Sequence, residues 1–160
     1  MYTESMIACI LESGKKVFLR HVVVDVLVVD RDKILLVKRA PELPNGGKYG
    51  VIGGYVERDE TLEQAARREV LEETGYKVKI NSLLRVKDSP HRPQEEVQNI
   101  AFVFIASPIK KTQEGDNEST EVKWFDFDNL PSQDEFAFDH YEDIQAYLRH
   151  GKSPQPMPLL

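Results

Sequence analysis

The sequence predicts an α/β protein, more closely an α/β/α sandwich built on a central mixed sheet. Apolar, valine-rich runs typical of buried strands recur along the chain. One segment between them carries start and stop signals for a helix, and a segment near the end repeats apolar residues at the helical period. Strands that alternate with helices in this way favour a sheet with one helix on each face.

The first strand-like segments predict a hairpin ahead of the main fold. Two runs, residues 6–11 and 16–20, flank the turn-forming residues Glu12, Ser13 and Gly14. This hairpin is a candidate for pairing with a second subunit, which would make the protein a homodimer.

We therefore divide the chain into three parts. Residues 1–20 form the hairpin extension, residues 21–150 a single domain, and residues 151–160, with three prolines, a flexible tail.

The core is predicted to begin with a second hairpin. Residues 22–29 are a nearly continuous valine-rich run that Asp25 interrupts, and residues 34–38 follow after a short polar turn. Continuous apolar runs imply strands that are buried on both faces. Further elements are expected in chain order: strands over residues 77–86, 97–106 and 121–127, and a helix over residues 138–150.

A loop and a short strand precede the first helix. Residues 40–48, rich in proline, glycine and asparagine, are predicted to be a loop. Residues 49–52 indicate a short strand, and we expect Gly53 and Gly54 to end it in a backbone turn that only small residues permit.

The first helix is predicted from Thr61 to Thr74. Thr61 and Gln64 match a capping box, and Gly75 is a typical C-terminal cap. At about 100° per residue, the helix brings Glu69, Glu72 and Glu73 onto one face.

These three glutamates predict a metal site. Like charges three and four residues apart weaken a helix, and a divalent cation removes that conflict. Hard oxygen ligands without cysteine or histidine suit Mg²⁺ or Mn²⁺ rather than Zn²⁺. The alternative is a solvated acidic helix face. The glycines before the helix, and Glu60 and Arg68 in register with it, favour the metal site, and we expect Arg68 and Glu60 to pair.

The spacing of these residues forms an extended motif. It is G-x5-E-x7-R-E-U-x-E-E-x-G-U, where U is bulky and apolar, and its members are Gly54, Glu60, Arg68, Glu69, Val70, Glu72, Glu73, Gly75 and Tyr76. From average composition, chance agreement is roughly 10⁻⁹ per starting position. The motif resembles the Nudix box, the signature of hydrolases that cut a nucleoside diphosphate linked to another moiety. Two positions depart from the usual pattern: Tyr76, where an aliphatic residue is commoner, and Ile52, where a proline usually precedes the two glycines.

The resemblance implies a Nudix-like fold and roles for individual residues. It implies metal ligation by the Gly53 carbonyl, Glu69, Glu72 and Glu73, and structural support of the box by Gly54, Glu60 and Arg68. The catalytic carboxylates are expected among Glu72, Glu73 and Glu118. Glu118 lies in an acidic loop where related enzymes often supply a base or an additional ligand, and Asp116 and Glu121 are its rivals. The alternative interpretation of this loop is a plain solvated surface.

Two short segments resemble the branch of the family that hydrolyses ADP-ribose. They are Gly115-Asp116-Asn117 and Phe138-Asp139-His140. The resemblance therefore implies cleavage of ADP-ribose to AMP and ribose 5-phosphate. A nucleoside triphosphate pyrophosphatase and a non-catalytic nucleotide-sensing module are the alternatives.

Some residues outside the motif have two readings. Arg39, at a strand end beside the glycine-rich loop, is either a substrate-binding residue that contacts a phosphate or an exposed side chain without a binding role. The same two alternatives apply to His91 and Arg92. For Trp124 we favour a core anchor over a base-stacking platform, and for His140 a hydrogen-bonding helix start over a catalyst.

Composition restricts the class of protein. A chain of 160 residues with 41% hydrophobic content suits one core, and a net charge of −6 argues against unassisted binding of nucleic acid. The single cysteine, Cys9, excludes an internal disulfide and suits the cytoplasm. No membrane span or signal peptide is expected.

Overall fold

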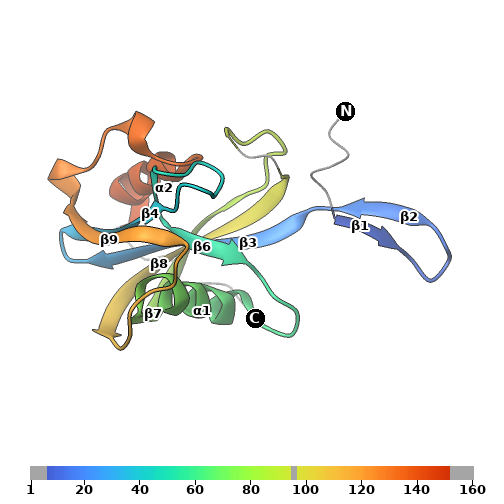
Figure 1. The fold of residues 1–160 in the computed structure, drawn as a ribbon, viewed down its shortest axis with the longest axis horizontal. Helices are drawn as coiled ribbons and strands as arrows, with labels where there is room; N and C mark the ends of the chain where they lie inside the picture. The colour runs from blue at the N-terminus through green and yellow to red at the C-terminus, as the bar shows by residue number, and fades with distance from the viewer. Residues whose placement is uncertain (1–6, 95–96, 152–160) are drawn as a thin grey trace.

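The computed structural model describes residues 7–94 and 97–151, and these form a mixed sheet with a helix on each face (Figure 1). The predicted α/β/α sandwich is therefore confirmed. Most of the predicted tail, residues 152–160, lies outside the described residues. No helix within the described ranges is both long and apolar enough to cross a membrane.

The central sheet has seven strands. They are β3 (His21–Asp30), β4 (Lys33–Arg39), β5 (Tyr49–Gly50), β6 (Ile52–Tyr55), β7 (Tyr76–Lys87), β8 (Asn99–Lys111) and β9 (Ser119–Asp126). The order β5-β4-β3-β8-β7 runs across the sheet, while β6 pairs with β3 and β9 pairs with β4. Only β3 and β8 are parallel among these pairs. The predicted strands are all present, with ends shifted by a few residues.

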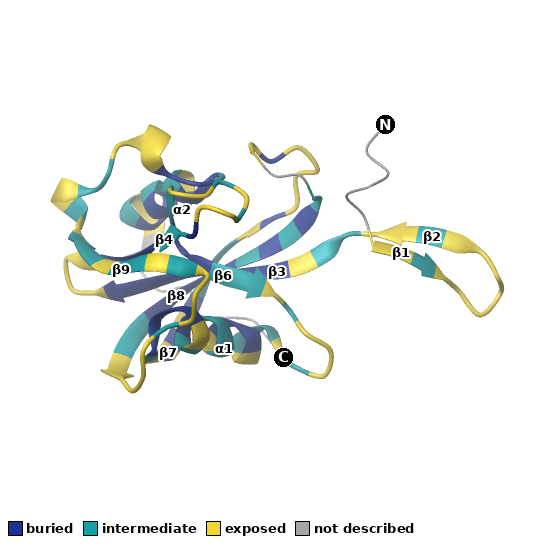
Figure 2. Cartoon of the chain, in the orientation of Figure 1, coloured by how far each residue is buried: buried dark blue, intermediate teal, exposed yellow. Residues whose placement is uncertain are grey.

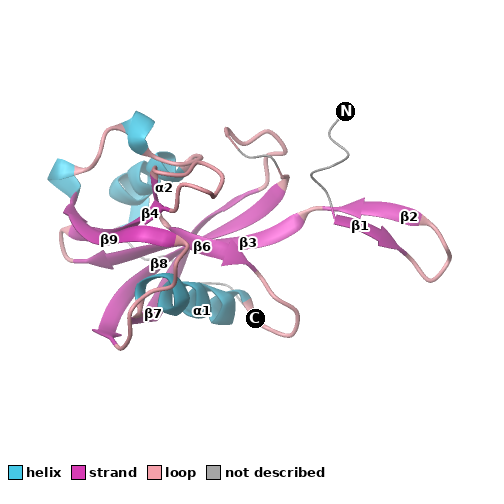
Figure 3. Ribbon diagram, in the orientation of Figure 1, coloured by secondary structure: helices cyan, strands magenta, loops and turns pink. Residues whose placement is uncertain are grey.

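Two helices cover the sheet from opposite sides (Figure 3). Helix α1 (Leu62–Thr74) packs on one face, and α2 (His140–Ala146), which continues as one π-helical turn over Tyr147–Gly151, packs on the other. The side chains of β3 alternate between these layers because strand residues point to opposite faces in turn. Val24, Val26 and Val28 belong to the α1 core, whereas Leu27 and Val29 belong to the α2 core. This explains why β3 is buried on both faces (Figure 2).

The N-terminal strands stand apart from this sheet. β1 (Ile7–Ile10) and β2 (Lys16–Leu19) pair antiparallel in a separate two-stranded sheet that projects away from the body (Figure 1). Ile10, Phe18 and Leu19 on this hairpin are exposed. The division of the chain into extension, domain and tail stays a prediction.

The structure corrects the predicted turn at Gly53 and Gly54. Both glycines lie inside strand β6 and pair in register with Asp25 and Val24 of β3. Neither has a positive φ, so the backbone does not turn there. Glycine is required at these positions because a side chain would not fit, and not because the backbone needs an unusual conformation. A Cβ atom on Gly53 would overlap the Val24 carbonyl oxygen, and one on Gly54 would overlap the Glu69 carboxylate.

Helix α1 begins and ends as the sequence predicts. The Thr61 hydroxyl accepts from the Gln64 amide at 3.2 Å, and the Thr61 amide donates to the Gln64 side chain at 2.7 Å. Gly75 ends the helix in the left-handed conformation at φ 75°, and its amide donates to the Leu71 carbonyl. Its carbonyl in turn accepts from the Thr112 amide at 2.8 Å, which ties the end of β8 to the end of the helix.

Substitution of Gly75 tests this junction. Gly75→Ala is expected to lower the free energy of unfolding by about 3 kcal/mol or more, because alanine is strained at positive φ and its Cβ would overlap the Gln113 carbonyl. Gly47→Ala is the matched control, since Gly47 has φ 78° with open space around it, and should cost only about 1 to 2 kcal/mol. Urea denaturation of both variants measures the difference, and equal costs would contradict the close packing at Gly75.

Candidate active site

Arg68 is the centre of the polar contacts on α1. Its guanidinium donates twice to Glu60, at 2.7 and 3.1 Å, so the ion pair expected from the sequence is present. The same group donates to the Tyr55 carbonyl at 3.0 Å, to Glu69 at 2.7 Å and to Glu72 at 3.1 Å. Arg68 thus links the loop before the helix, strand β6 and two of the motif glutamates.

The three glutamates of the cluster differ in burial. Glu73 is only 7% exposed, Glu69 is half-buried and Glu72 is exposed. The Glu69 carboxylate lies directly over Gly54, where a side chain would displace it. Burial raises the pKa of Glu69, although its hydrogen bond from Arg68 works in the opposite direction. The acidic face of α1 therefore holds a buried carboxyl group, that of Glu73, and a solvated one, that of Glu72, within one helical turn.

Glu73 is the most perturbed of the three. Desolvation raises its pKa to about 8, and this outweighs the opposing effect of the hydrogen bond that the Gly53 amide donates to it at 3.1 Å. The negative charges of Glu69, Asp116 and Glu118 raise the pKa further. Near neutral pH, without a cation, this carboxyl is therefore largely protonated.

Glu69 and Glu72 line a cavity of about 440 Å³, whose lining also includes Gly53, Gly54 and Arg68, while the buried Glu73 lies beneath it, bonded to the Gly53 amide. The acidic loop before β9 contributes Asp116 and Glu118 to the same cavity. The loop is held against α1, because the Asp116 amide donates to the Glu72 carbonyl at 2.8 Å. Of the three rival carboxylates, two are therefore brought to the cavity. Glu121 lies elsewhere and accepts from the Tyr49 hydroxyl at 3.2 Å.

Arg39, at the end of β4, also lines the cavity. Its Nε donates to the Pro44 carbonyl at 2.8 Å, which anchors the side chain to the loop that follows. Its guanidinium carbon is 5.2 Å from the centre of the Phe138 ring and interacts electrostatically with Glu73 and Glu118. The structure therefore places Arg39 in the cavity, and not among surface side chains away from it.

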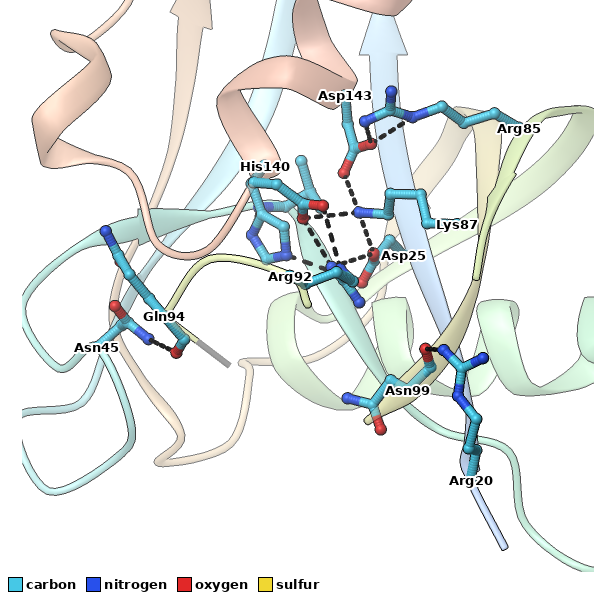
Figure 4. A network of polar contacts seen from close by, with 12 residues as sticks. Arg20, Asp25, Asn45, Arg85, Lys87, Arg92, Gln94, Asn99, His140 and Asp143 are labelled. Atoms are coloured by element: carbon cyan, nitrogen blue, oxygen red, sulfur yellow. Dashed lines mark hydrogen bonds and ion pairs between the residues drawn. The ribbon is translucent and has the colours of Figure 1, made fainter. Parts of the chain in front are cut away.

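A buried network of charges lies on the α2 face of the sheet, and two of its members, Asp25 and Arg92, also line the cavity (Figure 4). Lys87 is at its centre, with Nζ 3.1 Å from Asp25, 2.9 Å from Asp139 and 2.7 Å from Asp143. Arg92 donates to both Asp139 oxygens, at 2.6 and 3.1 Å, and Arg85 pairs with Asp143. Desolvation raises the pKa of Asp143 to about 6.

Sequence reasoning missed this network. The signal in its strand pattern was Asp25, a charged residue inside a valine run whose position in the alternation points it to the α2 face. The loop residue Arg92 is buried in the network, while His91 beside it is exposed. Their partners are far away in the sequence and could not be read from local spacing.

Two further residues take the roles that the sequence favoured. His140 is buried at the start of α2, where its Nδ1 accepts from the Val51 amide at 3.2 Å and burial lowers its pKa to about 4. Trp124 packs against the core, and its indole donates to the Tyr76 hydroxyl at 3.3 Å. His140 is thus a neutral hydrogen-bond acceptor, and Trp124 is a core anchor.

The donor set fits a hard divalent cation such as Mg²⁺ or Mn²⁺. Within the described part of the chain, no three histidine, cysteine or acidic side chains converge into a ready cage. Mg²⁺ does not need one, because it keeps several waters and binds through one or two carboxylates together with substrate phosphates. Glu69 and Glu73 offer carboxyl oxygens with little competing solvent, and the charge of a cation would favour the ionised form of Glu73.

Comparison with known proteins gives one family. A sequence profile of the NUDIX domain matches residues 19–147. An ADP-ribose pyrophosphatase from Methanocaldococcus jannaschii is 41% identical over 129 residues, which are 80% of this chain and 73% of that protein. An oxidized purine nucleoside triphosphate hydrolase from Danio rerio is 35% identical over 125 residues, which are 71% of each protein.

The fold agrees with this assignment. The crystal structure of a NUDIX hydrolase from Nitrosomonas europaea superimposes with a TM-score of 0.74 at 28% sequence identity. The match covers 95% of this chain and 90% of that one.

The raised pKa of Glu73 predicts a pH dependence of stability. The pKa rises from 4.5 to about 8 on folding, so the folded state holds a proton that the unfolded chain releases between these values. The metal-free protein should therefore lose stability as the pH rises through this window. Glu73→Gln removes the titrating group, and at pH 8 the variant should be more stable than the wild type by roughly 2 to 4 kcal/mol.

Urea denaturation at pH 5 and pH 8, in the presence of a chelator, measures this effect. The two proteins should approach each other in stability at pH 5. Glu72→Gln, which removes an exposed carboxylate of the same cluster and keeps Glu73, is the control and should lose stability between pH 5 and pH 8 as the wild type does. A stability difference between wild type and Glu73→Gln that does not change with pH would contradict the buried, protonated carboxyl.

Proposed function

The chain belongs to the NUDIX family and is a Nudix-type pyrophosphohydrolase, and on that premise we propose that it hydrolyses ADP-ribose to AMP and ribose 5-phosphate. The similarity to an ADP-ribose pyrophosphatase, 41% identity over 80% of the chain, carries the choice of substrate. The cavity supports it, because acidic side chains from α1 and the cationic Arg39 line the same space. A cation held by carboxylates and a positive side chain both stabilise the negative charge that develops on phosphoryl oxygens.

We propose that Mg²⁺ or Mn²⁺ binds through Glu69, Glu72, Glu73 and the Gly53 carbonyl. The bound cation would supply positive charge for the phosphoryl oxygens and lower the pKa of a bound water. Gly54, Glu60 and Arg68 would support this site, since Arg68 links Glu60 to Glu69 and Gly54 leaves space for the Glu69 carboxylate. Arg68 donates to Glu69 and Glu72 and thus limits their mutual repulsion before a cation binds.

The chain's own residues would then move one proton and stabilise charge. A water oxygen forms a bond to one phosphorus of the diphosphate, the bridging P–O bond breaks, and the other half leaves as a phosphate monoester. Glu118 is our proposed general base, since its carboxylate lines the cavity from the acidic loop, facing the carboxylates of α1. Glu72, also exposed, is the alternative base on the helix. Arg39 would neutralise charge on the phosphate that faces away from the carboxylates.

A nucleoside triphosphate pyrophosphatase remains the second candidate within the same chemistry. The 35% identity to an oxidized purine nucleoside triphosphate hydrolase is the observation that favours it. Both relatives carry the names of hydrolysing enzymes, which supports catalysis over nucleotide sensing.

We also propose a cytoplasmic location and a homodimer. The lone Cys9 suits a reducing compartment. The exposed Ile10, Phe18 and Leu19 on the hairpin β1–β2 support a second subunit as the partner of this hairpin, because an isolated two-stranded sheet is marginally stable in water.

A substrate panel tests the proposed reaction. The full chain should hydrolyse ADP-ribose, with AMP and ribose 5-phosphate as products, faster than other nucleotide sugars, dinucleoside polyphosphates or nucleoside triphosphates. Turnover should require Mg²⁺ or Mn²⁺ and disappear with a chelator, and Glu73→Gln should lose most of it while remaining folded. A preference for nucleoside triphosphates in chromatographic assays would instead select the second candidate.

A pair of glutamate variants tests the proposed base. Glu118→Gln should lower kcat by about 10² to 10⁴-fold, because the carboxylate that accepts the water proton is lost. Glu121→Gln, in the same segment but bonded to Tyr49, should retain kcat near the wild-type value. The pH–rate profile should lose its acidic limb only in Glu118→Gln. If that limb persists in Glu118→Gln and is lost in Glu72→Gln, the base lies on the helix.

A further inference from the structure

Phe138 combines an unfavourable backbone conformation with a place in the cavity. Its φ is 52°, in the left-handed region that bulky side chains rarely adopt. Its ring is half-buried and lines the same cavity as Glu69, Glu72 and Arg39. Glycine or asparagine would fit this backbone with less strain. A large aromatic residue here costs stability, so the surrounding contacts must hold its backbone in place.

The buried network holds the chain immediately after Phe138. Asp139 accepts from Arg92 at 2.6 and 3.1 Å and from Lys87 at 2.9 Å. His140 accepts from the Val51 amide at 3.2 Å. Before Phe138, the Ala137 amide donates to the Tyr49 carbonyl at 2.8 Å. Strained residues persist where their surroundings over-determine them, and the bonds on both sides of Phe138 meet that condition.

The ring is placed next to the cationic part of the cavity. The Arg39 guanidinium carbon is 5.2 Å from its centre, within the range of a cation–π contact. Arg39 also interacts electrostatically with Glu73 and Glu118. Arg39 therefore interacts both with the carboxylates of the cavity and with the aromatic ring. The His140 ring, which is buried and also lines the cavity, is 5.3 Å from the Phe138 ring between centres.

We propose that Phe138 and Arg39 form a nucleotide-binding shelf, on which the purine stacks against Phe138 while a phosphate of the same nucleotide contacts Arg39. The proposal rests on the proposed function and adds the direction of the substrate. The diphosphate lies between the carboxylates of α1 and Arg39, the AMP half extends towards α2, and the ribose 5-phosphate half remains on the acidic side. A stacked base suits this position, since any planar base can contact a ring face.

Tyr55 is the competing aromatic residue in the cavity. It lies on β6, is 50% exposed, and has no positive φ. Its ring contacts His21 at 4.9 Å between centres, and its carbonyl accepts from Arg68. No described cation contacts the Tyr55 ring in the way that Arg39 contacts Phe138. A purine on Tyr55 would reverse the direction of the substrate, which makes Tyr55 the matched control.

Calorimetric binding of AMP and of ribose 5-phosphate to the full chain in Mg²⁺ tests the shelf. Wild type should bind AMP more tightly than ribose 5-phosphate, because only AMP carries a base. Phe138→Leu keeps an apolar side chain, and Phe138→Asn keeps a residue that tolerates positive φ, so that at least one ring-free variant folds. Each should weaken AMP binding about tenfold, with ribose 5-phosphate binding unchanged. Phe138→Trp should restore AMP binding, and Tyr55→Leu should retain the preference for AMP.

Several results would overturn the shelf. They are equal weakening of both ligands in the Phe138 variants, unchanged AMP binding in those variants, a wild type without preference for AMP, or loss of that preference in Tyr55→Leu instead. Failure of the proposed function has a different signature. Wild type that hydrolyses none of the diphosphate compounds, yet binds AMP through Phe138, would reject the reaction and leave the shelf in place. Hydrolysis of ADP-ribose with AMP binding indifferent to Phe138 would reject the shelf alone.

Discussion

The close approach of helix α1 to strand β6 is the constraint on which the site depends. Gly54 leaves space over the strand for the Glu69 carboxylate, and the Gly53 amide donates directly to Glu73, while the missing side chain of Gly53 leaves space for the β3 backbone. Any larger residue at either position would overlap the β3 backbone or the Glu69 carboxylate. This contact costs electrostatic free energy, because it removes carboxyl groups from water. The raised pKa of Glu73 results from this desolvation. A hard cation would reverse that penalty, which links the packing of the fold to its proposed chemistry.

The cavity is bounded by two ion networks of different character. On the α1 side, Arg68 is shared among carboxylates that are partly open to solvent, so the contacts can rearrange when a cation and a substrate arrive. On the α2 side, Lys87 and Arg92 are buried with Asp139 and Asp143, where desolvation makes each unpaired charge expensive. Such a network is a weak source of net stability, but removal of any one member leaves an uncompensated charge. It therefore holds one arrangement of the cavity wall, including the strained backbone at Phe138.

The elements that local patterns specify could be predicted from the sequence. The capping box at Thr61, the left-handed Gly75 and the pairing of Arg68 with Glu60 each involve residues close together in the chain, and each is present. The valine run of β3 indicated burial on both faces, because alternation along a strand needs no tertiary information. The expected turn at Gly53 and Gly54 was wrong because glycine serves two purposes, conformational freedom and close approach, and sequence alone does not distinguish them.

The sequence by itself determined the order of strands and helices, the acidic face of α1 and the class of ligand that such a face suits. Tertiary structure decided which distant residues meet there. It brought Asp116 and Glu118 to the cavity but left Glu121 bonded to Tyr49, and it assembled Asp25, Lys87 and Asp143 from β3, β7 and α2. The physical reason is range: caps, periodicity and turns act over a few residues, whereas burial and ion pairing depend on contacts between segments tens of residues apart. Those long-range contacts decide how far each carboxyl group is buried, and burial in turn affects whether the group is ionised.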